Sequence, residues 1–126
     1  MSNRMSLKDF RKKGCVSEKE EQKMCLQFLN TIPGMVVWRQ NTGRAKYQNK
    51  DGSFRTVSYG VRGISDIIGY FRSENGVKPF FWEVKTAKGK LSQAQKEFLD
   101  KVLQDGCLAG YGTCEDLINY IRSIDI

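Results

Sequence analysis

Residues 80–85 (FFWEVK) constrain the fold of this chain more than any other stretch. The run is aromatic and β-branched with turn residues on both sides, which predicts a buried β-strand. Side chains alternate along a strand, so Glu83 and Lys85 share one face while Trp82 and Val84 occupy the other. A carboxylate beside an amine can hold a divalent cation and keep the amine near the water that the cation activates. The simpler alternative is an ion pair between Glu83 and Lys85 on a solvated sheet face.

The composition limits the chemistry that is open to the chain. Its 126 residues suffice for one domain with a single core. The net charge of +7 favours a polyanionic partner, and nucleic acid leads because no apolar run is long enough to cross a bilayer. The sequence has no histidine, which excludes histidine-dependent catalysis, and its four cysteines lack C-x-x-C spacing, which argues against zinc. The groups that remain for catalysis are carboxylates, lysine and a hard cation. No apolar segment of a secretion signal follows the N-terminus, so we expect a cytoplasmic protein.

The N-terminal part combines a basic segment with an acidic helix start. Residues 1–16 predict a basic arm, either lying on a phosphate backbone or solvated, and residues 17–126 predict a single domain. Ser17 opens a helix that ends near residue 29, with Glu20 completing a capping box. Glu18 and Glu21 fall on the apolar side of this helix, where carboxylates are rare without a partner.

The next region predicts a first strand at residues 35–41, followed by a hairpin around residues 50–52. Cations alternate here with aromatic rings, which is typical of a nucleic-acid surface because cations meet phosphates and rings stack or pack against sugars. The same rings are also compatible with packing between strands. The residues concerned are Arg39, Arg44, Lys46, Lys50 and Arg55 among Trp38, Tyr47, Phe54 and Tyr59.

A second carboxylate is expected to approach Glu83. The apolar strand at residues 66–71 and the strand of Glu83 are joined by a turn at residues 73–76, which predicts an antiparallel hairpin. This pairing can bring Asp66 close to Glu83, and two carboxylates converging near Lys85 need a cation to be tolerable. The plain alternative for Asp66 is a turn or cap residue.

The remaining elements predict an α/β fold. Ser92 and Gln95 mark a capping box, and the helix that follows presents Phe98, Leu99, Val102 and Leu103 to the sheet. Residues 107–111 form the last strand, which lies parallel to strand 80–85 through a right-handed crossover, and Thr113 caps a closing helix. Leu117, Tyr120 and Ile121 of that helix either close the core or form a dimer face.

Five stretches in order resemble the core of the PD-(D/E)XK nucleases, and more narrowly a stand-alone VRR-NUC domain of the phage and bacterial type. They span residues from about 17 to 111 and are Ser17-Glu18 with Gln22, 38–43 (WRQNTG), 63–69 (GISDIIG), 83–85 (EVK) and 89–95 (GKLSQAQ). The resemblance implies a restriction-endonuclease-like α-β-β-β-α-β core, with a mixed central sheet flanked by helices and an extra C-terminal helix. Ser65 stands where the motif usually has proline. Glu21 stands where an apolar residue is expected, which leaves open whether Glu18 or Glu21 faces the metal.

The resemblance also implies a metal site. Acids of this family surround one or two Mg²⁺ or Mn²⁺ ions, which implies Asp66 and Glu83 as direct ligands. The backbone carbonyl of Val84 would be a further ligand, and Glu18 would act directly or through a water.

The same resemblance assigns roles to polar neighbours of the acids. Lys85 would position or deprotonate the attacking water. Gln95 would orient Lys85 or the phosphate, and a plain capping role for Gln95 fits the sequence equally well. The residues expected to contact DNA are Arg39, Asn41, Arg44, Lys46, Lys88 and Lys90.

The expected function is therefore a metal-dependent, structure-specific endonuclease that hydrolyses phosphodiester bonds in branched DNA such as four-way (Holliday) junctions. The resemblance implies a homodimer, since a junction needs two symmetric cuts, with no membrane and no organic cofactor, and a location in the host cytoplasm if a phage encodes it. The alternatives are a flap or single-strand structure-specific nuclease, and a basic DNA-binding module without catalysis.

Overall fold

The computed structural model describes residues 16–40 and 43–124, and at residues 43–45 and 58–59 it describes the backbone alone. Its elements are α2 (Glu18–Leu29), β1 (Met35–Arg39), β2 (Gly43–Gln48), β3 (Phe54–Tyr59), β4 (Ile67–Ser73), β5 (Gly76–Val84), α3 (Gln93–Gln104), β6 (Leu108–Gly112) and α4 (Cys114–Ser123). The predicted basic arm lies outside this part except for Val16. None of the helices described here has both the length and the apolar character to cross a membrane.

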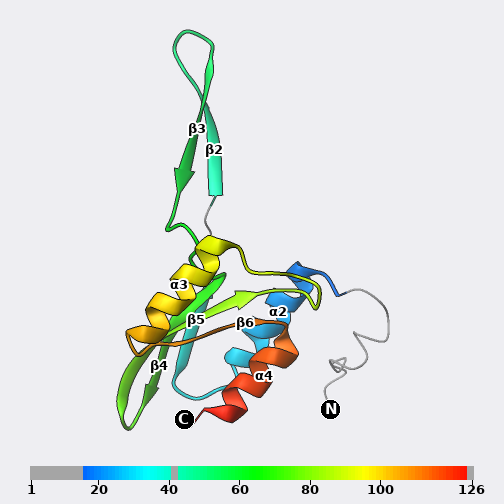
Figure 1. Ribbon diagram of the computed structural model, residues 1–126, viewed down its shortest axis with the longest axis vertical. Helices are drawn as coiled ribbons and strands as arrows, with labels where there is room; N and C mark the ends of the chain where they lie inside the picture. Colours follow the sequence, from blue (N-terminus) through cyan, green and yellow to red (C-terminus); the bar gives the residue numbers. More distant parts are fainter. Residues whose placement is uncertain (1–15, 41–42, 125–126) are drawn as a thin grey trace.

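A mixed four-stranded sheet in the order β1-β4-β5-β6 forms the centre of this α/β fold. β4 is antiparallel to β1 and to β5, with Ile67 opposite Trp82. β5 is parallel to β6 across the α3 connection, which confirms the predicted strand-helix-strand unit. β2 and β3 form a separate antiparallel hairpin that rises away from the body of the molecule (Figure 1).

The alternation of side chains along β5 gives the sheet two differently covered faces. Trp82 and Val84 are buried in the core together with side chains of α2 and α4. Phe81 points the other way and meets Phe98 of α3, with ring centroids 5.3 Å apart and planes at 78°. The sheet therefore lies between α3 on one side and α2 with α4 on the other (Figure 1). Because Glu83 is two residues from Phe81, it lies on the α3 face.

Each described helix begins at the capping residue predicted for it. Ser92 and Thr113 form complete capping boxes with the third residues of α3 and α4. The Ser17 hydroxyl accepts a hydrogen bond from the Glu20 N–H at 3.1 Å, but the return bond from the Glu20 side chain does not form. The prediction of a full box at α2 is therefore only half correct.

The closing helix α4 completes the core within this chain. Leu117 and Ile121 are buried, and the Tyr120 hydroxyl accepts a hydrogen bond from the Ala109 N–H at 3.1 Å. The apolar side of α4 is thus used inside the fold. In α3, by contrast, Leu103 is 49% exposed, so the prediction that it faces the sheet is wrong. It borders a hollow between α3, β6 and α4 instead.

Candidate functional site

Two carboxylates meet where β4 begins and β5 ends. Asp66 immediately precedes β4, and its Oδ2 accepts a hydrogen bond from the Val84 N–H at 2.9 Å. Glu83 is only 2% exposed. The hairpin of β4 and β5 thus brings the two acids together, as their pairing predicted. Val84 is joined to Asp66 through its N–H, and the role of its carbonyl as a ligand stays a prediction.

The surroundings of Glu83 disfavour its charged form. Burial, hydrogen bonding with Asp66 and the negative charge of Asp66 raise the pKa of Glu83 to about 8, with a further contribution from Glu18. The ammonium of Lys85 opposes this rise, and its Nζ lies 3.8 Å from Glu83 Oε1. The Oε2 atom of Glu83 is buried and receives no hydrogen bond from a donor in the described residues. A shared proton, or a cation between the carboxylates, would satisfy this atom.

Gln95 forms the predicted cap and also contacts Glu83, while its predicted role of orienting Lys85 or the phosphate stays a prediction. Its Oε1 accepts a hydrogen bond from the Ser92 N–H at 2.8 Å, which completes the capping box of α3. Its Nε2 donates to Glu83 Oε1 at 2.9 Å. One amide group therefore ties the beginning of α3 to the buried acid and fixes the orientation of that carboxylate.

The two acids of α2 have different surroundings. Glu21 is 1% exposed, and its Oε2 accepts a hydrogen bond from the Cys114 N–H at 2.7 Å in the first turn of α4. A carboxylate is favourable there because the first N–H groups of a helix lack partners within the helix. Glu18 is exposed and lines a cavity of about 440 Å³ together with Asp66. The prediction that Glu18 lies on the core side is therefore wrong, since the buried row of α2 begins only at Glu21.

The cavity beside the acids is mostly polar in its lining residues. Its walls are Glu18, Lys19, Gln22, Arg39, Gln40, Ile64 and Asp66. Arg39 reaches it because the end of β1 pairs with the beginning of β4. Sequence reasoning missed Lys19 and Gln40 as site residues. The sequence offered one signal for them, since each directly follows a predicted site residue in the chain.

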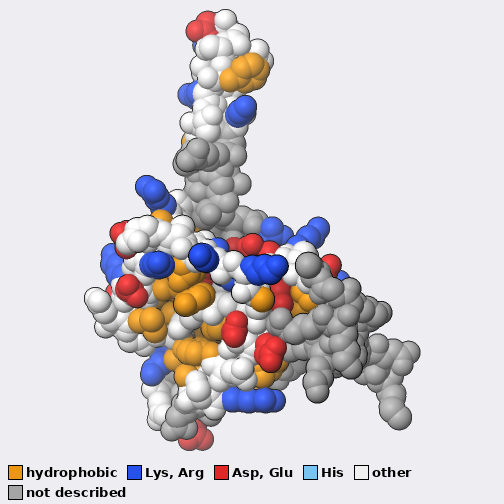
Figure 2. Space-filling model, turned by 45° about the vertical axis from the view of Figure 1, so that its right-hand side comes forward, with side chains coloured by type: hydrophobic (Ala, Val, Ile, Leu, Met, Phe, Trp, Pro, Cys, Tyr) orange, Lys and Arg blue, Asp and Glu red, His pale blue; other side chains and the backbone are white. Residues whose placement is uncertain are grey.

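Three of the predicted DNA-contacting residues are exposed lysines, and two more lie wholly or partly outside the described residues. Lys88 and Lys90 are exposed in the loop that joins Lys85 to α3, and Lys46 is exposed on the hairpin. Asn41 lies outside the described residues, as does the side chain of Arg44. Basic side chains are visible both over the body and on the hairpin (Figure 2).

The acid pair is the feature to which a metal would bind. Within residues 16–40 and 43–124, no group of three or more His, Cys, Asp or Glu side chains forms a ready metal site. Two adjacent carboxylates, one with a buried oxygen that lacks a donor, nevertheless fit a hard cation with oxygen ligands. The exposed Glu18 side chain is near enough to raise the pKa of Glu83 but does not complete a third position.

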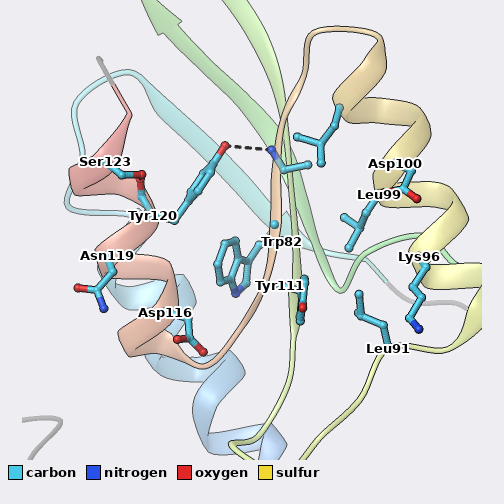
Figure 3. A pocket seen from close by; sticks show the side chains of 13 residues that line it. Trp82, Leu91, Lys96, Leu99, Asp100, Tyr111, Asp116, Asn119, Tyr120 and Ser123 are labelled. Carbon is cyan, nitrogen blue, oxygen red and sulfur yellow. Dashed lines mark hydrogen bonds between the residues drawn. The ribbon is translucent and has the colours of Figure 1, made fainter.

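A larger hollow of about 920 Å³ lies elsewhere, between α3, β6 and α4 (Figure 3). It is bordered by Trp82, Leu99, Tyr111 and Tyr120 among others, and none of the acids of the candidate site lines it. Gly110 leaves room for the indole ring there, because a Cβ at this position would lie 2.6 Å from Trp82 Cζ3. This hollow is therefore separate from the acid pair.

Comparison of the chain with protein-family models, with curated proteins and with solved structures finds no match in any of the three. The family resemblance of the five sequence stretches thus stays a prediction.

Proposed function

We propose that this protein is a Mg²⁺- or Mn²⁺-dependent DNA endonuclease that hydrolyses phosphodiester bonds in branched DNA, built on a restriction-endonuclease-like core. The observation that carries the proposal is Glu83, a buried carboxylate in contact with Asp66 and 3.8 Å from the ammonium of Lys85. Two acids in contact, one of them buried, cost stability unless a proton or a cation lies between them. A binding function for a cation explains why the chain keeps this arrangement.

Asp66 and Glu83 are the proposed direct ligands, with the Val84 carbonyl as a further one and Glu18 reaching the cation through a water. Hard oxygen donors of this kind suit Mg²⁺ and Mn²⁺. When bound, such a cation would neutralise the scissile phosphate and lower the pKa of its water. The Val84 N–H holds the carboxylate of Asp66 in place for this role.

Lys85 and Gln95 are the proposed supporting groups. The Lys85 N–H donates to the Gly112 carbonyl at 2.9 Å, which fixes the chain at the end of β5 while the side chain lies on the Glu83 side. Its ammonium positions the attacking water and stabilises the negative charge that develops on the phosphate. The Nε2 of Gln95 holds Oε1 of Glu83 and leaves Oε2 of Glu83 for the cation.

The substrate class follows from charge, and its branched form from the resemblance. A net charge of +7 attracts a polyanion, and Arg39 brings a cation to the cavity beside Asp66. Each chain offers one acid pair, and a four-way junction needs two symmetric cuts, so we propose a homodimer. A basic module that only binds DNA would have no use for carboxylates beside the phosphates.

The test is cleavage of an end-labelled four-way junction with and without Mg²⁺, with duplex, flap and single-stranded DNA of matched sequence in parallel. We expect Glu83→Ala to abolish cleavage and Lys85→Ala to slow it by about a hundredfold or more, as removal of one such charge-stabilising group does elsewhere. Lys78→Ala is the matched control, because Lys78 is an exposed lysine of the same strand, remote from the acids.

The outcomes separate the candidates. Wild-type cleavage by Glu83→Ala or Lys85→Ala would remove the role of that residue. Binding without cutting under Mg²⁺ and Mn²⁺ would favour the non-catalytic module, and preferred cutting of flaps or single strands would replace the junction as substrate.

A further inference from the structure

The hairpin of β2 and β3 is open to solvent along residues 46–57, the part of it whose side chains are described, where only Asn49 is half-buried. The two strands pair with each other in a sheet of their own, and the hairpin projects from the molecule (Figures 1 and 2). Its large apolar side chains are open to solvent: Phe54 is 69%, Tyr47 51% and Val57 41% exposed. An isolated two-stranded hairpin is marginally stable in water, so these side chains have no evident structural purpose where they stand.

The β2–β3 hairpin is a two-stranded ribbon, and each face of this ribbon combines an aromatic ring with a cation. Tyr47 lies opposite Arg55, whose guanidinium carbon is 5.8 Å from the centre of the ring. Phe54 and Lys46 have the other parity and lie on the second face. The sequence from 43 to 59 contains four basic residues and one acidic residue, Asp51, which accepts the Ser53 N–H in the turn. The charge of the ribbon is therefore complementary to a polyanion.

The base of the ribbon lies at the acid site. The hairpin is inserted between β1 and β4, which pair with Arg39 opposite Ile67. Next to that pair, the Gln40 N–H donates to the Asp66 carbonyl at 2.6 Å. A loop of six residues, 60–65, connects the end of β3 to Asp66. DNA whose phosphate reaches Asp66 and Glu83 therefore continues past the base of the hairpin.

We propose that the β2–β3 ribbon inserts into the major groove of a duplex arm of the substrate. The major groove admits a two-stranded β-ribbon, whereas the minor groove is about half as wide. Cations on both faces would reach the phosphates on the two walls of the groove, and Tyr47 and Phe54 would contact base edges such as thymine methyl groups. Six residues per strand extend about 20 Å, so contacts should reach roughly six base pairs from the cut.

This inference rests on the proposed function for the position of the cut, but its first test measures binding alone. Full-length protein is titrated onto a fluorescent 30-base-pair duplex and onto a four-way junction in EDTA, at several salt concentrations. One variant removes three hairpin cations, Lys46→Ala with Lys50→Ala and Arg55→Ala. The control removes three exposed cations of the body, Arg72→Ala with Lys78→Ala and Arg122→Ala, and so has the same net charge.

The hairpin variant should lose up to about three phosphate contacts, which lowers the slope of log affinity against log salt by roughly 2.7. Wild-type protein would then lose about 40-fold more affinity than this variant between 50 and 200 mM salt. The body control should keep the wild-type slope. Tyr47→Ala with Phe54→Ala should weaken binding roughly tenfold at an unchanged slope, because apolar contacts are lost and no charges. Unchanged melting temperatures check that the variants are folded.

Chemical interference identifies the groove. Methylation of guanine N7, a major-groove atom, should block binding within about six base pairs of the cut, and adenine N3, a minor-groove atom, should not. Interference at N3 alone, or equal slopes for the hairpin and body variants, would overturn the inference. A shift from dimer to monomer in the hairpin variants, with DNA binding per chain unchanged, would show that a second copy covers the ribbon and would also overturn it. Hairpin-dependent binding without cleavage under Mg²⁺ would refute only the endonuclease.

Discussion

Gln95 offers a sharp test of the site, because one side chain serves the helix and the acid through different atoms. Its Oε1 caps α3 at Ser92, and its Nε2 holds Glu83. Ser92→Ala removes the hydroxyl that accepts the Gln95 N–H and leaves the Glu83 contact, whereas Gln95→Ala removes the reciprocal bond from the Ser92 N–H together with the Glu83 contact. Each variant therefore loses one half of the capping box, and only Gln95→Ala changes the surroundings of the acid.

The expected sizes follow from those contacts. Loss of a Ser cap costs about 1 kcal/mol, which is a shift of about 4 °C in melting temperature for a domain of this size. Gln95→Ala loses the reciprocal bond and also the donor to a buried carboxyl, which adds about 1–3 kcal/mol. For activity, a carboxylate that is no longer held in position costs about tenfold to a hundredfold, since each 1.4 kcal/mol of transition-state stabilisation is a factor of ten.

The assay is single-turnover cleavage of the four-way junction under Mg²⁺, well below both melting temperatures, beside thermal melts of the same samples. We expect Ser92→Ala to cleave within about threefold of wild type, which is below 1 kcal/mol, and Gln95→Ala to cleave at least tenfold more slowly. Gln95→Glu is the second variant, because it keeps the acceptor for the Ser92 N–H and replaces the donor to Glu83 by a third carboxylate. It should keep the bond from the Ser92 N–H but melt below wild type, because the buried Glu83 carboxyl loses its donor, and it should be inactive. Equal activity of Ser92→Ala and Gln95→Ala would show that Gln95 acts only as a cap.

Two further predictions concern the acids themselves. Glu21→Ala should destabilise the fold by about 1–3 kcal/mol, because it removes the acceptor of a buried N–H at α4, while Glu18→Ala should melt like wild type and cleave more slowly; the reverse pattern would exchange their roles. Because the pKa of Glu83 rises from 4.5 to about 8 on folding, the metal-free folded state binds more protons than the unfolded state in this interval, so its stability should fall as pH increases from 4.5 to 8. Urea melts in EDTA should show this slope flattened in Glu83→Gln, and Mg²⁺ should raise the melting temperature more at pH 8 than at pH 6; an equal slope in Glu83→Gln would assign the pH dependence to other groups.

The features that could be predicted from the sequence are those set by near neighbours in the chain. The alternation along β5 placed Glu83 and Lys85 on one face, and the short turn before Gly76 fixed the antiparallel pairing that brings Asp66 to Glu83. Capping residues marked the beginning of each helix. These signals are local because a turn or a cap is formed within a few residues.

The features that escaped prediction depend on distant partners. The helical period placed Glu18 and Glu21 on the same side of α2, and only the Cys114 N–H, 93 residues later, separates a structural acid from a candidate site acid. Likewise, the cations and rings of the hairpin read the same whether the strands are packed or exposed. Their exposure is decided by the absence of any covering element over β2 and β3 in the described structure, which no local pattern contains.

The position of the acid pair explains how a small fold tolerates it. The main core of the protein lies on the face of β5 toward α2 and α4, where Trp82 and Val84 are buried, and it contains neither Asp66 nor Glu83. Glu83 lies on the opposite face, near the C-terminal end of β5. There the beginning of α3 supplies a hydrogen-bond donor and the neighbouring Lys85 supplies a positive charge. Burial is thus sufficient to strengthen electrostatic interactions at Glu83, while the cavity at Asp66 stays open to a ligand. A pair of acids placed in the main core would meet the same desolvation cost with no route for a cation or a phosphate, so the ends of the central strands β4 and β5 are where this chemistry is compatible with folding.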